Sequence, residues 1–157
     1  MTDAQIHRSL AVDLFNQTWM LMEKSDRTPE DVDNMIHGAH SSRHHWGMVG
    51  DATNHSIGEW QISRVYTVLK RAEPALFHAR RCLEISEQNK LKPFNIGYAH
   101  EAIARALSLT NDPAVSHHLE LARQLAETIT DMEDQKILLT DLATVPVVKR
   151  SGVDTSA

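Results

Sequence analysis

Apolar residues recur every three or four positions along most of this chain, and that spacing is the period of an α-helix. The 157 residues include only six glycines and five prolines, so few positions interrupt the pattern. Runs of alternating β-branched residues, which would indicate strands, are almost absent from the sequence. The sequence therefore predicts an all-α protein.

The prolines indicate where helices begin. In Thr28-Pro29 the threonine can cap a helix whose first residue is the proline, because that position has no intrahelical donor to lose. Asp112-Pro113 repeats the arrangement, with Asp112 as the expected cap. The chain is then divided into seven predicted helices, at about 4–24, 29–47, 53–71, 73–89, 93–110, 113–130 and 133–143.

The connections between these segments are short, which places consecutive helices antiparallel to one another. An apolar share of 41% over this length suffices for one hydrophobic core. We therefore expect a single all-helical domain over residues 1–144. The polar ending, rich in Ser, Gly, Asp and Thr, predicts a flexible C-terminal tail over residues 145–157.

Composition excludes several functional classes. A net charge of -5 argues against binding to nucleic acid or to an anionic membrane surface. No stretch approaches about 18 uninterrupted apolar residues, so no membrane span is expected. The start of the chain lacks the profile of a signal peptide, and the single cysteine, Cys82, cannot form an internal disulfide. The predicted location is the cytoplasm.

The second half of the chain contains a weak internal repeat. Pro74-Ala75-Leu76 matches Pro113-Ala114-Val115 at a spacing of 39 residues. Each repeat unit would be a helix, a tight turn and a second helix, and such hairpins bury their apolar faces only by stacking on neighbours. Because two units alone would be marginal, the first three helices are expected to complete the core.

The segment from Gly58 to Asp131 resembles tetratricopeptide-type helical hairpins. Tyr66 stands where that motif has the aromatic residue of its first helix, and Ala75 and Cys82 stand at the two small positions of the second helix. The tryptophan, leucine and glycine of the motif are not reproduced in register, and the unit is longer than the usual repeat of about 34 residues. The resemblance implies a right-handed, tetratricopeptide-like array of antiparallel helical hairpins.

Four segments are also similar to a bacterial group of small all-helical proteins: Ser42–Gly47, Glu59–Tyr66, His78–Glu84 and Glu101–Ala106. This similarity extends over most of residues 1–145. No reaction is assigned to the group, so the similarity implies a helical fold and no activity.

Ten histidines are distributed along the chain, and the densest set lies on the second predicted helix. His37, His40 and His44, together with Asp33, form a polar stripe beside the apolar stripe of that helix. Neutral imidazoles bind divalent metals, and a carboxylate one turn away can bind the ion or orient a ligand. His37 and His44 lie about 10 Å apart on a straight helix, so one ion needs an adjacent pair plus donors from other helices. The available donors are His55, Glu59, His78, His100 and Glu101.

The sequence contains no HExxH or CxxC motif. The alternative interpretation is that these histidines form hydrogen bonds at a helix interface and titrate near neutral pH. We favour this interface over a metal site.

Charged residues also occur on the third predicted helix, which is apolar on several faces and is expected to be central. Its Glu59 and Arg64 need partners if they are buried, and Glu101 and Arg105 on the fifth predicted helix can supply them. These residues form an internal salt-bridge network that fixes helix register. Alternatively, Glu59, Arg64 and His78 point into a polar pocket between the second, third, fourth and fifth predicted helices. We favour the network.

Trp19, Trp46 and Trp60 are expected to anchor the core, and any of them exposed on a concave face would mark a partner site. Stacked hairpins present an extended groove, and the sequence contains no complete catalytic constellation. We therefore expect a non-enzymatic helical scaffold that binds a protein or peptide partner without a cofactor, with self-association into a homodimer covering an open end. The alternative is a protein, a hydrolase among others, that binds a divalent metal or small ligand at a histidine-lined site between helices.

Overall fold

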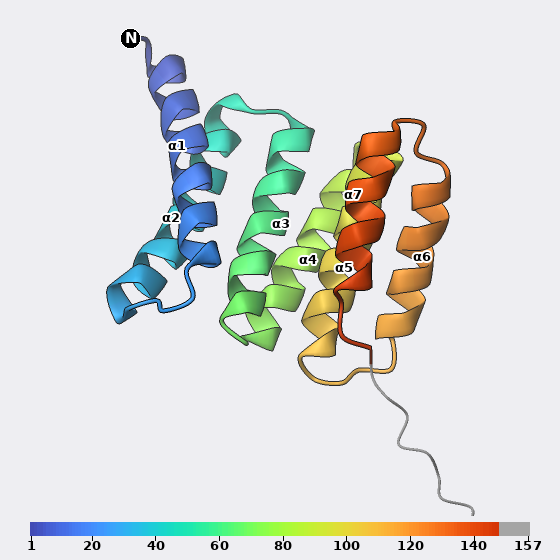
Figure 1. Ribbon diagram of the computed structural model, residues 1–157. Helices are drawn as coiled ribbons and strands as arrows, with labels where there is room; N and C mark the ends of the chain where they lie inside the picture. Colours follow the sequence, from blue (N-terminus) through green and yellow to red (C-terminus); the bar gives the residue numbers. More distant parts are fainter. Residues whose placement is uncertain (148–157) are drawn as a thin grey trace, which may run out of the picture.

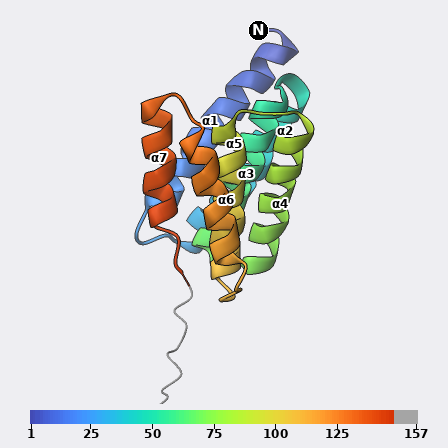
Figure 2. The ribbon, with the colours of Figure 1, turned by 90° about the vertical axis from the view of Figure 1, so that its right-hand side faces the viewer.

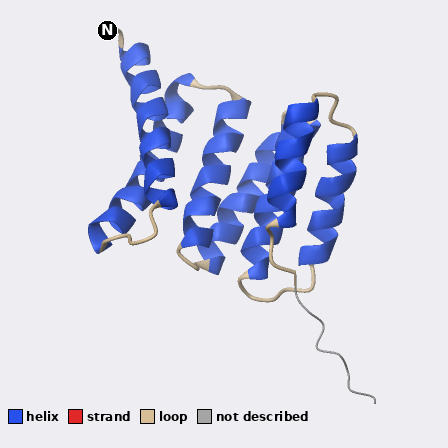
Figure 3. Ribbon diagram, in the orientation of Figure 1, coloured by secondary structure: helices blue, strands red, loops and turns tan. Residues whose placement is uncertain are grey.

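A computed structural model of the chain describes residues 1–147. These residues form seven α-helices and no strand, which confirms the predicted all-α class and the number of helices (Figure 1, Figure 3). The right-handed, tetratricopeptide-like arrangement stays a prediction. The helices are α1 (Asp3–Glu23), α2 (Pro29–Val49), α3 (Ala52–Val68), α4 (Ala72–Gln88), α5 (Pro93–Ser108), α6 (Val115–Glu127) and α7 (Met132–Ala143).

Side-chain caps define the start of four helices. Thr2, Thr28, Asp51 and Asp131 each accept a hydrogen bond from the backbone N–H three residues later. The expected cap at Asp112 is wrong, because α6 begins only at Val115 and Asp112 accepts from the Ala114 amide within the preceding turn. Such caps satisfy amide groups that a helix cannot satisfy within itself.

The connections after α3, α4 and α5 share one turn geometry. Each contains a non-glycine residue in the left-handed region: Lys70 with φ 61°, Lys90 with φ 49° and Asn111 with φ 52°. In each turn the next residue donates its amide to a carbonyl five residues earlier, as in a Schellman motif. These hydrogen bonds join Arg71 to Tyr66, Leu91 to Ser86 and Asp112 to Leu107.

The helices form two layers. α1, α3, α5 and α7 contact one another in that order, while α2, α4 and α6 each pack against the two flanking members of this series. In the view turned by 90°, α7 lies on one side of the molecule and α4 on the other (Figure 2). α3 contacts four helices and has nine buried residues, in agreement with the central position predicted for it.

The core consists of two clusters of buried side chains. One joins α4, α5, α6 and α7 around Leu119 and Leu138. The other joins residues of α1, α2, α3, α4 and α5 around Met35 and Ile62. Small residues allow close approach between helices: a Cβ on Gly97 of α5 would lie 2.6 Å from Leu138 Cδ2 of α7. The two clusters meet at Leu76, which packs against both.

The expected flexible tail begins at residue 145, but Val145 is only 4% exposed and belongs to the C-terminal core cluster. Residues 148–157 of that tail lie outside the described residues. Among the helices of residues 1–147, none combines the length and apolar character needed to cross a membrane.

Candidate functional site

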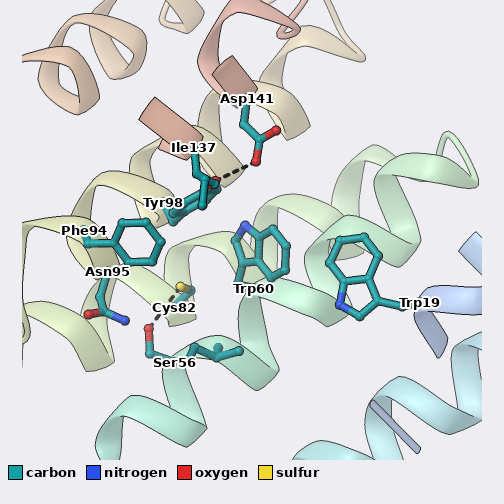
Figure 4. Close-up of a pocket in the computed structure, with 10 residues that line it drawn as sticks. Trp19, Ser56, Trp60, Cys82, Phe94, Asn95, Tyr98, Ile137 and Asp141 are labelled. Atoms are coloured by element: carbon teal, nitrogen blue, oxygen red, sulfur yellow. Dashed lines mark hydrogen bonds between the residues drawn. The ribbon is translucent and has the colours of Figure 1, made fainter. Parts of the chain in front are cut away.

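A cavity of about 320 Å³ lies where α1, α3, α5 and α7 converge, with α4 behind it (Figure 4). We call it the aromatic pocket, because four of its lining residues are aromatic. Its wall is largely apolar, and its size falls within the range of pockets that hold small molecules or single large side chains. The lining residues are Trp19, Ser56, Ile57, Trp60, Cys82, Phe94, Asn95, Tyr98, Ile137 and Asp141.

The four aromatic rings form a continuous row from α1 to α5 (Figure 4). The ring centroids of Trp19 and Trp60 are 5.6 Å apart, those of Trp60 and Tyr98 are 5.7 Å apart, and those of Phe94 and Tyr98 are 5.0 Å apart. The last two contacts are edge-to-face, the arrangement that the ring quadrupoles favour. Trp19 and Trp60 thus pack against the core, as expected for anchors, and also line a cavity.

Most polar groups in the wall are engaged with one another, but Trp60 Nε1 is buried without a hydrogen-bond partner among the described residues. The Tyr98 hydroxyl donates to Asp141 Oδ2 at 2.6 Å, and burial together with this acceptor raises the pKa of Tyr98. Ser56 Oγ lies 3.4 Å from Cys82 Sγ, and burial raises the pKa of this thiol to about 12. The thiol therefore stays protonated at neutral pH and is not an activated nucleophile.

A cluster of charged side chains adjoins Asp141 of the pocket wall. The Glu101 side chain, 1% exposed, accepts from Arg64 Nη1 at 3.2 Å and from Arg105 Nε at 2.6 Å through the same oxygen. Arg105 also donates to the Asp141 backbone carbonyl at 3.1 Å. The two guanidinium groups thus share the Glu101 carboxylate as their ion-pair partner, and the charge of Asp141 also acts on Arg64.

The polar residues predicted to form one network lie in two separate groups. Arg64, Glu101 and Arg105 are together, but Glu59 pairs instead with Arg43 and His78, so the expectation that all four share one cluster is wrong. The sequence reasoning missed Arg43. A Cβ on Gly58 would lie 2.6 Å from Arg43 Cδ, so this glycine opens the path along which Arg43 crosses α3. A glycine inside the third predicted helix was the sequence feature that could have indicated this close approach.

The second group links α2, α3 and α4. His78 Nδ1 lies 2.7 Å from Glu59 Oε2, and Arg43 Nε donates to Glu59 Oε1 at 3.0 Å. These partners outweigh burial and lower the pKa of Glu59. His40 Nε2 lies 2.9 Å from the Tyr66 hydroxyl, and its ring meets His78 edge-on at 5.3 Å.

The structure does not bring the other two stripe histidines into this group. His37 lines a groove between α1 and α2, and the ring of His44 lies against His45. Within residues 1–147, no three His, Cys, Asp or Glu side chains are grouped so that they could hold a metal ion. His40, Glu59 and His78 are the predicted ligand candidates that lie together, and the divalent metal stays a prediction.

No family model matches the chain, and no curated protein and no solved structure shows significant similarity to it. The function is therefore argued from the geometry of these sites.

Proposed function

We propose that this protein is a non-enzymatic scaffold that binds a peptide segment of a partner protein across the aromatic pocket. The observation that carries the proposal is a second hollow, of about 210 Å³, that shares Ile57 with the aromatic pocket. Its lining comes from α1, α2 and α3: Val12, Phe15, Asn16, Trp46, Asn54 and Ile57.

Two hollows on either side of one residue suit a peptide better than a single small molecule. A peptide can place one large apolar side chain in each hollow while its backbone passes over Ile57. Ile57 is 38% exposed, and Val12 of the second hollow and Ile137 of the aromatic pocket are 41% and 49% exposed, so exposed apolar surface extends across both hollows. Exposed apolar surface of this kind marks interaction sites.

The polarity of the wall specifies the side chains that would enter. Because Arg64 and Arg105 are already paired with Glu101, and the Asp141 carboxylate already accepts from Tyr98, a charged side chain would lose its hydration without gaining a free partner. An uncharged aromatic or long aliphatic side chain would instead gain contacts with the ring row. The carboxamide of Asn95 in the pocket lining offers a donor and an acceptor to the peptide backbone.

The test is selection of 12-residue peptides from a random displayed library on the wild-type protein. We expect enriched peptides to carry two large apolar residues separated by a few positions. Ile57→Asp should weaken the binding of a selected peptide at least about tenfold, equivalent to about 1.4 kcal/mol. Leu139→Asp is the matched control, because Leu139 is similarly exposed at 43% on α7 and lines neither hollow.

Equal binding of the selected peptides to wild type and Ile57→Asp would show that the two hollows are not the site. Sedimentation of the same variants distinguishes another occupant. A dimer that Ile57→Asp dissociates and Leu139→Asp preserves would mean that a second copy covers the pocket, and the peptide proposal would be wrong.

A further inference from the structure

Two histidines meet across the interface between α1 and α2. Nδ1 of His7 lies 2.8 Å from Nδ1 of His45, and the ring centroids are 5.0 Å apart. Both residues are partly exposed, so an ion can reach them from solvent. We propose that His7 and His45 together bind a divalent transition-metal ion with copper(II)-like, tetragonal geometry.

The separation of the two nitrogens fits one type of coordination geometry. With metal–nitrogen bonds of about 2.0 Å, a gap of 2.8 Å subtends an angle of about 90° at the metal. That is the angle between neighbouring ligands in the tetragonal sites of copper(II) and nickel(II). A tetrahedral zinc ion would need the nitrogens to lie about 3.3 Å apart.

The tautomers of the two rings can also suit a metal. In the absence of metal, a bond between two Nδ1 atoms needs one ring to carry its hydrogen on Nδ1 and the other to leave its Nδ1 free as an acceptor. With metal bound, both Nδ1 atoms face the ion and the ring hydrogens are on Nε2.

The cationic side chain that follows His7 packs on an aromatic ring. The guanidinium of Arg8, the residue after His7, lies over the Trp46 ring at 5.4 Å from its centroid. No third His, Cys, Asp or Glu within residues 1–147 joins the pair as a ligand, so water completes the coordination. Water ligands are compatible with tetragonal copper(II).

A second histidine pair provides an internal comparison. Nδ1 of His100 and Nδ1 of His118 are 3.0 Å apart between α5 and α6. His100, however, is only 7% exposed, so an ion has little access to this pair from solvent. This pair is therefore not expected to take up an ion, although it has the same pair of atoms at a similar distance.

Copper(II) alone, titrated into the full chain at neutral pH, tests the proposal. We expect one tight copper(II) per chain, with an electron paramagnetic resonance spectrum of a tetragonal ion bound by two imidazole nitrogens. His7→Gln and His45→Gln should each weaken that binding at least about tenfold. His44→Gln and His118→Gln are the matched controls and should bind as the wild type does.

Thermal unfolding gives a second measurement. Copper(II) that joins α1 to α2 should raise the unfolding midpoint of the wild type, because it binds the folded state. The midpoint of His45→Gln, a variant that keeps a polar group at a partly exposed position, should respond less. Unchanged affinity in either pair variant, or an equal loss in His44→Gln, would overturn the proposal.

Discussion

The imidazoles of this protein titrate in unusual surroundings. Burial, then the neighbouring His118 and His117, lower the pKa of His100 from 6.5 to about 4. The pKa values of His40, His45 and His118 are also lowered, in each case first by burial and then by nearby histidines among other charges. Burial in the folded protein therefore favours the neutral form of these side chains.

The lowered pKa of His100 predicts acid sensitivity. The unfolded chain binds this proton below pH 6.5 and the folded chain only near pH 4, so stability is fully present above pH 6.5 and is lost as pH falls toward 4. A shift of this size corresponds to about 3 kcal/mol. His100→Gln should therefore lose less stability between pH 7 and pH 4.5 than the wild type does, as measured by urea unfolding.

The exposed His37 serves as the control position, and His37→Gln should keep the pH dependence of the wild type. If His100→Gln proves too unstable to compare, His118→Gln removes one repulsive neighbour and should reduce the acid sensitivity by a smaller amount. Parallel stability curves for the wild type and both α5–α6 variants would contradict the prediction.

The surroundings of Glu101 also allow the effect of a substitution on the free energy of unfolding to be predicted. Glu101→Gln leaves Arg64 and Arg105 without their carboxylate in a largely buried site, which should lower the free energy of unfolding by about 3 kcal/mol. Glu84→Gln breaks an ion pair with Arg81 of 2.6 Å that is about half exposed, and should cost less than about 1 kcal/mol. Denaturant unfolding of both variants measures the difference, and equal effects would refute it.

At the scale of elements, the sequence predicted the start of some helices correctly but did not indicate where others end. Thr28 and Pro29 begin α2 as predicted, because a cap acts within a few residues of sequence. The ends of α3 and α4 had no glycine to mark them, because lysines occupy the left-handed positions at Lys70 and Lys90. Tertiary packing of the following helix holds these residues in a conformation that their own side chains disfavour.

This strain predicts a stabilising substitution. Lys90→Gly removes the clash of a Cβ in the left-handed region, and after the entropy cost of glycine it should add about 0.5–1 kcal/mol to the free energy of unfolding. Lys92→Gly is the control, because its φ of -61° needs no glycine, and it should be neutral or destabilising. The thermal unfolding midpoints of the two variants test this expectation. A lower midpoint in Lys90→Gly than in the wild type would contradict it and show that the lysine side chain makes a stabilising contact.

At the scale of the whole molecule, burial is uneven along the series of helices. α5 has nine buried residues among 16, whereas α1 has three among 21 and α7 has two among 12. The terminal helices also carry many of the exposed large apolar residues, among them Leu10 and Met20 on α1 and Ile137 and Leu139 on α7. An array of this kind is expected to open from its ends.

Native-state hydrogen exchange tests this expectation. Amides in α3 and α5 should exchange slowest, with protection close to the global free energy of unfolding, and those in α1 and α7 should exchange earlier. Equal protection in all seven helices would mean that the chain unfolds as one cooperative unit.

The number and order of the helices follow from the sequence alone, because the apolar period, the caps and the prolines act over a few residues. The pairing of Arg64 and Arg105 with Glu101 could also be predicted from the sequence, since a buried charge on a central helix requires an opposite charge. Other contacts between helices could not be predicted in this way. Arg43 and Glu59, His7 and His45, and the ring row from Trp19 to Phe94 join residues far apart in the chain. Their meeting depends on how each helix is rotated about its axis, and the packing of all seven helices together decides that rotation.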